Sequence, residues 1–158
     1  MALSPNDIKT QYPLPVYNYR VEVGGQSISF SEVSGLSIGY ETTTYKESKT
    51  DQQPGGGPRV MHMPAQPTPT NISLKKGYVL RNSIDVFYNW INSIRINQVE
   101  KRDISIYLCD EEGKPIVTWK VINAFPTKLD APSFDANSND VAIESMELMA
   151  DKIELSEV

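Results

Sequence analysis

Apolar and polar residues alternate along most of the chain, a pattern typical of strands that bury one face. The clearest segment is 16–23, and the pair Gly24-Gly25 after it predicts a hairpin turn. Two more alternating segments, 28–33 and 36–45, meet at Ser34-Gly35, where glycine allows the positive φ of a turn. This part of the chain therefore predicts three strands in a meander.

The same alternation returns in the second half of the chain. It predicts further strands at 71–76, 103–108, 115–123 and, beyond a kink, 124–128. Within 141–155 the apolar residues occupy odd positions first and even positions later. We expect a strand with a β-bulge there, although a helix also fits loosely.

Residues 83–95 change to a helical period. Apolar residues recur there every three or four positions: Ile84, Phe87, Ile91 and Ile94. Ser83 is a suitable N-cap for a helix that begins at this point. We expect one helix over about 83–95, with its apolar stripe packed on the sheet.

Two segments carry proline or glycine in place of the alternation. Residues 1–15 end in Tyr12-Pro13-Leu14-Pro15, which predicts an extended N-terminal arm before a single domain at 16–158. Residues 46–70 contain Pro54-Gly55-Gly56-Gly57-Pro58, which predicts a long loop, either a floppy excursion or an arm that orders on a partner. The elements together predict a mainly β fold: a small antiparallel β-barrel or sandwich of roughly six or seven strands with one flanking α-helix.

Composition excludes several classes of protein. The chain has 158 residues, 39% of them hydrophobic and 22% charged, which suits one folded domain with a core. The net charge of -5 argues against a dedicated nucleic-acid binder, which needs a basic patch. The single cysteine, Cys109, cannot form an internal disulfide or a cysteine zinc cluster. No signal peptide or apolar membrane span is evident, so we expect synthesis in the cytosol.

Few side chains are suited to catalysis or metal binding. His62 lies between Met61 and Met63, a trio that could bind a soft metal such as copper, but an ordinary strand or loop position is favoured. Residues 135–140 resemble the start of a calcium loop but lack the Gly and Glu that an EF-hand needs at its sixth and twelfth positions, so a polar turn is favoured. With one histidine and one cysteine, no nucleophile–base pair is evident. We expect no catalytic, cofactor-binding or metal residues, and not an enzyme.

Eight segments, taken in order, make the chain similar to a known family: 19–23, 30–36, 45–47, 71–77, 87–90, 101–104, 119–126 and 144–148. The set resembles the tail tube protein family of contractile phages and of phage-tail-like contractile injection systems, related to the ring-forming tube protein of type VI secretion. Residues 49–69 depart from the family pattern, because they are richer in proline and less basic, and this bears on the local ring-stacking contacts.

The resemblance implies a β-barrel flanked by a helix. It implies hexameric rings that stack into a hollow inner tube inside a contractile sheath, with baseplate and terminator proteins as further partners. Such a tube is made in the bacterial cytoplasm, becomes part of a phage tail or of an injection particle that can be released, and is driven through a target envelope. Its lumen can carry cargo.

A tube wall needs a strand face that meets water and strand edges that pair between subunits. We expect a lumen face from the polar positions of the strands: Ser27, Ser29, Ser31, Ser37, Glu41, Thr43, Asp103 and Ser105. We expect subunit or ring-stacking contacts from the N-terminal arm and from the two loops: Tyr45, Lys46, Glu47, Pro54, Gly55, Gly56, Gly57, Met61, His62, Met63, Asp135 and Asn137.

The leading hypothesis is thus a structural tube protomer, and two other functions fit the same residues. A secreted, ring-forming cargo adaptor or effector would share the fold, and a neighbouring sheath gene would separate it from a tube protein. A stand-alone ligand-binding β-barrel would have a closed apolar pocket and remain a monomer.

Overall fold

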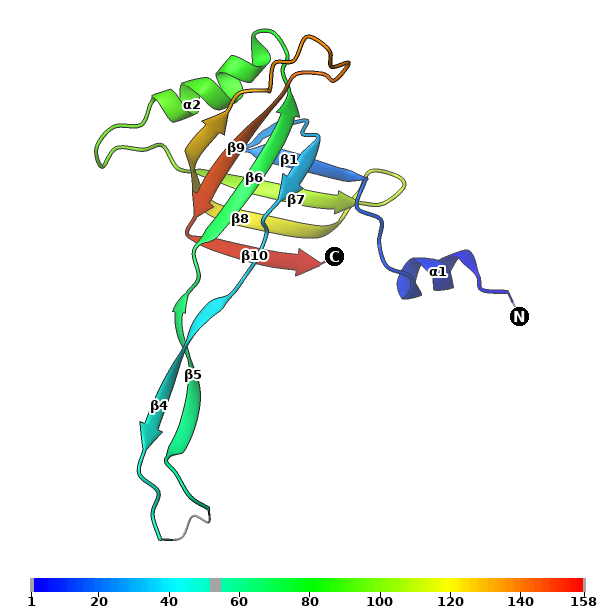
Figure 1. The fold of residues 1–158 in the computed structure, drawn as a ribbon. Coiled ribbons are helices and arrows are strands. Elements are labelled where there is room, and N and C mark those ends of the chain that lie inside the picture. The colour runs from blue at the N-terminus through cyan, green and yellow to red at the C-terminus, as the bar shows by residue number, and fades with distance from the viewer. Residues whose placement is uncertain (1, 52–54, 158) are drawn as a thin grey trace.

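The computed structural model describes residues 2–51 and 55–157 and is mainly β, as the alternation predicts (Figure 1). The described residues form ten strands: β1 (Tyr19–Val23), β2 (Gln26–Ile28), β3 (Glu32–Ser34), β4 (Tyr40–Glu47), β5 (Arg59–Pro67), β6 (Thr70–Gly77), β7 (Arg102–Cys109), β8 (Pro115–Asp130), β9 (Ile143–Ala150) and β10 (Lys152–Glu157). Three helical segments accompany them: α1 (Pro5–Gln11), the π-helix η1 (Ile84–Tyr88) and α2 (Asn89–Asn92).

Eight of the strands form one antiparallel sheet in the order β2-β1-β7-β8-β9-β6-β3, with β10 added beside β8. The 16-residue β8 belongs to two layers, because its first part pairs with β7 and β10 and its last part pairs with β9. We call β2, β1, β7, β10 and the first part of β8 the first layer; the second layer comprises β3, β6, β9 and the rest of β8. The strands of the two layers cross steeply (Figure 1). Within the described residues no strand pairing joins β2 to β3, so the sheet curls without closing into a barrel.

The hydrophobic core lies between the two layers. The first layer contributes fully buried side chains at Val21, Ile104 and Val121, and the second layer contributes them at Leu74 and Leu148. These residues occupy alternate positions of their strands, so one face of each layer is apolar. Burial of this apolar surface is the main term that stabilises the fold.

The helical segment covers one end of the core, at the place that the sequence predicts, but it is shorter and has a different buried face. The wider π-helical turn of η1 changes which residues face the core. Val86, Phe87 and Trp90 are buried, while Ile84 is 43% exposed. The Phe87 ring stacks on Phe30 with centroids 5.8 Å apart. No helix in the described part of the chain is long and apolar enough to span a membrane.

The predicted β-bulge near residue 143 is wrong. β9 alternates without interruption: its buried positions are Glu144, Met146, Leu148 and Ala150, and Ile143 faces outward. The apparent change of phase arises because a glutamate, not an apolar residue, occupies the first inward position. Asp151 then separates β9 from β10.

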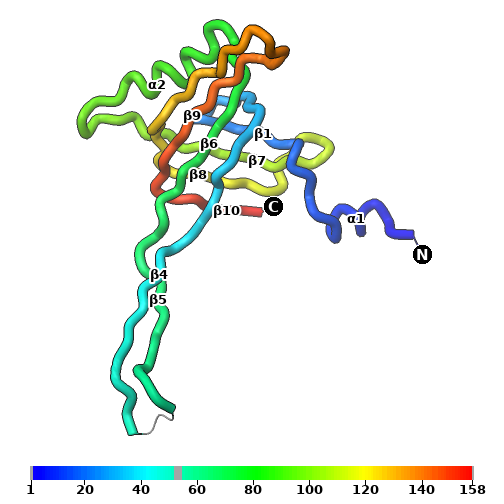
Figure 2. The backbone as a smooth tube through the Cα atoms, in the orientation of Figure 1, coloured from blue at the N-terminus to red at the C-terminus, as the bar shows by residue number. Residues whose placement is uncertain are grey.

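Two other expectations need correction. The predicted loop at 46–70 is largely a two-stranded hairpin, in which β4 pairs with β5 and projects away from the two layers (Figures 1 and 2). The N-terminal arm is not extended throughout, because residues 5–11 form α1. Ser4 caps this helix: its hydroxyl accepts a hydrogen bond from the Asp7 amide, and the Asp7 carboxylate accepts one from the Ser4 amide.

Candidate assembly surfaces

The outward face of the first layer is polar and its side chains lie in cross-strand rows. Register places one row across five strands: Ser27, Glu22, Ser105, Lys120 and Glu154. A second row runs beside it: Arg20, Tyr107, Thr118 and Ser156. We call these two rows the polar face. They give one side of the sheet a wall of alternating charge and hydroxyl groups that can face water.

Contacts join the two rows where β1 meets β7. The Tyr107 hydroxyl donates to the Glu22 carboxylate over 3.2 Å. The Arg20 guanidinium lies 5.2 Å from the centre of the Tyr107 ring, within range of a cation–π interaction. The polar face is therefore partly held in place and not simply solvated.

The residues expected on a lumen face separate into three groups. Ser27 and Ser105 lie on the polar face, and Asp103 lies at its margin on β7. Ser29, Ser31 and Ser37 lie in the connections that flank β3; the Ser31 hydroxyl donates to the Lys75 carbonyl, and the Ser37 carbonyl accepts from Thr70. Glu41 and Thr43 lie on β4, in the projecting hairpin. The structure thus brings three of these residues together and places the other five elsewhere.

Sequence reasoning missed most of the polar face. Glu22, Lys120 and Glu154 occupy its central row, and none of them is among the residues expected on the lumen side. The period-two alternation of their strands could have found them, because each follows an inward apolar residue. Which strands lie side by side was the missing information.

Asp103 has a structural role at the bend of β8. Asn123 adopts a positive φ of 56°, a conformation that favours Asn over other side chains, and this turns β8 from one layer to the other. Its amide donates to Asp103 Oδ1 over 3.0 Å, and its side-chain amide donates to Asp151 Oδ2 over 3.1 Å. Asp151 also forms an ion pair with Lys101 at 3.5 Å. The kink expected after residue 123 is confirmed, and these contacts lie at it.

The projecting hairpin carries most of the residues expected to contact other subunits. Tyr45, Lys46 and Glu47 on β4 pair with Met61, Val60 and Arg59 on β5. Its other side chains include Met63 and His62, whose ring accepts or donates at 3.2 Å from the Thr44 hydroxyl. Gly55, Gly56 and Gly57 lie at the tip and are exposed, and Pro54 lies outside the described residues. An isolated two-stranded hairpin is only marginally stable in water, so a packing partner would stabilise it.

The trio Met61-His62-Met63 does not converge on one point. Consecutive residues of a strand point to opposite faces, so His62 faces away from its two neighbours. Across the described ranges, 2–51 and 55–157, no three or more His, Cys, Asp or Glu side chains are arranged to hold a metal ion. Asp135 and Asn137 form a polar turn, as predicted, because the Asn137 amide donates to Asp135 Oδ1 over 3.0 Å.

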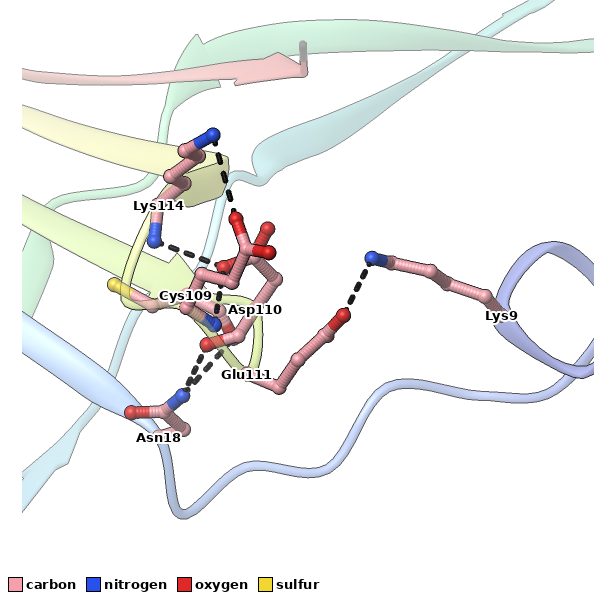
Figure 3. A network of polar contacts seen from close by, with 7 residues as sticks. Lys9, Asn18, Cys109, Asp110, Glu111 and Lys114 are labelled. Carbon is pink, nitrogen blue, oxygen red and sulfur yellow. Dashed lines mark hydrogen bonds and ion pairs between the residues drawn. The ribbon is translucent and has the colours of Figure 1, made fainter. Parts of the chain in front are cut away.

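The N-terminal arm is held against the acidic β7–β8 turn (Figure 3). Lys9 Nζ lies 2.9 Å from Glu111 Oε1, and this hydrogen bond lowers the pKa of Glu111 and raises the pKa of Lys9. Asp110 organises the turn by accepting hydrogen bonds from the amides of Glu112 and Lys114, and the Lys114 bond is the main cause of its lowered pKa. α1 buries none of its residues, so the arm is attached weakly to its own chain.

Both ends of the first layer are unpaired strand edges. Within the described residues β2 pairs only with β1, and β10 pairs only with β8. Between the layers an apolar pocket of about 540 Å³ opens beside Tyr19, Leu108 and Trp119. Val16 and Tyr17 on its rim are each 82% exposed, so the pocket is open to solvent and differs from the closed cavity of a ligand-binding barrel. Unpaired edges and exposed apolar groups are both features of a protein that associates with other chains.

These features define a class: a β protomer that is built to assemble. A family model for the T4-like virus tail tube protein gp19 matches residues 15–154. The chain therefore belongs to the T4-like virus tail tube protein family, and its role is that of a structural tail tube protein. A comparison with curated proteins gave no match.

Solved structures agree with this assignment. A chain of the PVC sheath–tube complex, from an extracellular contractile injection system in the extended state, is 43% identical with a TM-score of 0.87, over 99% of this chain and 100% of that chain. A chain of the anti-feeding prophage cap, which terminates the tube, is 40% identical with a TM-score of 0.84 and full coverage of both chains. A chain of the PVC sheath/tube terminator is 44% identical with a TM-score of 0.82, over 93% of this chain and 99% of that one.

Proposed function

We propose that this chain is the protomer of a hollow inner tube, formed by hexameric rings that stack inside a contractile sheath. The observation that carries the proposal is the 43% identity, over 99% of the chain, to a protein of a sheath–tube complex. The hexameric symmetry follows the family resemblance. The neighbouring structures, a sheath–tube complex, a tube-terminating cap and a sheath/tube terminator, support sheath and terminator proteins as partners. That baseplate proteins are further partners is inferred from the family resemblance. In this role the chain performs no catalysis.

The polar face supplies the wall of the channel in this proposal. Its rows of Glu22, Lys120 and Glu154 present both signs of charge to the channel, so a hydrated cargo of either sign can pass without strong retention. The opposite side of the same layer is the hydrophobic core. A single layer thus separates a wet lumen from a dry interior.

The free edges of the first layer close the ring. β10 of one copy pairs with β2 of its neighbour, which extends the sheet from subunit to subunit through main-chain hydrogen bonds. The exposed apolar rim at Val16 and Tyr17 lies against the same neighbour. The projecting hairpin, which lies outside the two layers, reaches the next ring.

Sedimentation and electron microscopy of the purified chain test this function. The proposal predicts hollow rings or tubes whose formation depends on protein concentration, and tube particles that contain this chain inside a sheath. A chain that remains monomeric at every concentration, and that is missing from every sheathed particle of its source cell, overturns the proposal.

A further inference from the structure

A carboxylate lies where the fold otherwise buries apolar side chains. Glu144 occupies the first inward position of β9, two residues before the inward Met146, and is only 6% exposed. Its Oε1 atom is buried and has no hydrogen-bond partner among the described residues. An unpaired buried polar atom is costly, and a partner that the isolated chain does not supply would remove this cost.

Glu144 lines a pocket of about 270 Å³ together with Tyr78, Ser83, Ile84, Tyr88 and Leu129. Tyr78 and Tyr88 are 43% and 52% exposed, whereas Glu144 and Ser83 are buried. The pocket therefore has a carboxylate and a hydroxyl at its base and two aromatic rings at its entrance. A carboxylate below aromatic rings is the combination that binds a cationic side chain, through a charge-assisted hydrogen bond and cation–π contacts.

The cation nearest to Glu144 in the strand register leaves Oε1 of this carboxylate without a hydrogen bond. Lys76 lies opposite Glu144 in the register of β6 and β9, and both are buried, yet Glu144 Oε1 still has no partner among the described residues. Burial raises the pKa of Glu144, and the Ser83 hydroxyl and the Lys76 charge act in the opposite direction without cancelling the rise. An additional cation in the pocket would therefore stabilise the ionised carboxylate.

The pocket and the hairpin lie at opposite ends of the molecule. β6 leads from the hairpin, which ends at Pro67, to Tyr78 on the pocket rim, and Figure 1 places the hairpin at one end and α2 at the other. In a head-to-tail stack of identical rings, the hairpin of one copy would therefore point toward the pocket end of the next. The hairpin offers Arg59 near its tip, where its guanidinium lies a long 3.6 Å from the Glu47 carboxylate and is half exposed.

We propose that the pocket formed by Tyr78, Ser83, Tyr88 and Glu144 binds the Arg59 side chain of a second copy of this chain. The inference rests on the proposed function, because stacked rings supply the second copy. A guanidinium fits the pocket better than an ammonium, since its planar group pairs with a carboxylate and stacks on aromatic rings. The contact would supply a hydrogen bond to Glu144 Oε1, the one buried side-chain nitrogen or oxygen atom that lacks one in the described chain.

A titration with a small probe tests the pocket without requiring assembly. The unassembled 158-residue chain, labelled with ¹³C at glutamate carboxyl groups, is titrated with n-propylguanidinium, and n-propylurea serves as the neutral control. The proposal predicts that the guanidinium shifts the Glu144 carboxyl signal and lowers its titration midpoint, that the urea does not, and that Glu144→Gln weakens probe binding about tenfold or more. Equal responses to the two probes, or none to either, overturn the cation site.

A double-mutant cycle tests Arg59 as the occupant. Arg59→Gln and Glu144→Gln should each raise the protein concentration needed for tube growth about tenfold, and the double variant should be no worse than either single variant. Lys114→Gln is the control, because Lys114 is also an exposed cation in an ion pair, with Glu112 at 3.3 Å, but lies outside both the hairpin and the pocket and should leave that concentration unchanged. Additive effects of the two substitutions overturn Arg59 as the partner. A wild-type chain that forms no tubes overturns the proposed function and the second copy with it, while the probe titration still decides whether the pocket binds a cation.

Discussion

Replacing Gly35 by alanine should disrupt the packing of the turn after β3 against the backbone of β6. Gly35 follows β3 and has a φ of +87°, which costs an L side chain about 1–2 kcal/mol. An added Cβ would lie 2.2 Å from the carbonyl oxygen of Asn71 and 3.2 Å from the Ile72 Cα. Both neighbours are backbone atoms of β6, a strand paired on both sides, so they cannot move aside without shifting the sheet. Overpacking of this kind adds about 1–3 kcal/mol, giving a total of roughly 2–5 kcal/mol.

Gly25 provides a matched control for the contact. It has the same φ of +87°, but a Cβ added there meets no atom within 4 Å. Gly25→Ala should therefore cost only the conformational part, about 1–2 kcal/mol. Both substitutions restrict the unfolded chain equally, so the difference between the variants, about 1–3 kcal/mol, measures the clash with β6.

Denaturant unfolding of the unassembled chain, followed by the fluorescence of the buried Trp90, gives both free energies of unfolding. Measurements on unassembled protein are needed because assembly adds stability that depends on concentration. Gly35→Ala should lower the midpoint much more than Gly25→Ala, with similar slopes. Equal losses in the two variants would show that Gly35 does not pack against the Asn71 backbone, and would refute the position of the turn after β3 against β6.

Three further predictions concern the pH dependence, the bend of β8 and the arm. Because burial raises the folded-state pKa of Glu144 above its ordinary 4.5, the wild-type chain should lose stability as the pH rises through that raised pKa. Unfolding titrations should therefore show that Glu144→Gln is the more stable unassembled protein at neutral pH, and that the difference in free energy of unfolding disappears below pH 4.5. A difference that does not depend on pH would contradict this. In the same unfolding assay Asn123→Ala should cost about 1–2 kcal/mol and Asn123→Gly should cost less. Both variants lose the hydrogen bond to Asp151, but only glycine tolerates the positive φ of 56°. Equal costs would rule out backbone strain as the cause. Lys9→Gln should leave the free energy of unfolding unchanged, because the Lys9–Glu111 pair is exposed. It should speed hydrogen exchange in residues 5–11, because the pair holds this part of the arm. Unchanged exchange would mean that the pair does not hold the arm.

The sequence predicted best where a strand has one face on the core. β6 and β7 lie where the alternation of Ile72 with Leu74 and of Ile104 with Ile106 places them. The long β8, with its kink near residue 123, was also predicted. In each case every second side chain is buried and most of these side chains are apolar, because a shift of the strand register by one residue would expose all of them. The alternation is therefore visible in the sequence.

Three features were missed because the sequence rules that apply to them hold only on average. The prolines of β5, Pro64 and Pro67, suggested a loop, but a two-stranded hairpin has only edge strands, where proline is tolerated. The arm contained the signal for α1, a Ser4–Asp7 capping box with Pro5 at the first helical position, and the later prolines obscured it. Glu144 suggested a bulge because a buried carboxylate breaks an apolar alternation.

The polar face could be predicted only in part. Ser27 and Ser105 were identified from their own strands, but their position in one row with Glu22, Lys120 and Glu154 depends on which strands pair and in which register. Cross-strand neighbours are tertiary information that a single sequence with period-two alternation does not contain. The serines around β3 share the same local pattern and lie elsewhere for this reason.

The most direct test is a cryo-EM map of the tube, at a resolution that shows side chains. We expect Glu22, Lys120 and Glu154 to line the channel, β10 of each copy to pair with β2 of its neighbour, and each hairpin to reach the next ring. A map in which the polar face lies on the outside of the tube, or in which the edges of β2 and β10 remain unpaired between copies, would contradict this expectation.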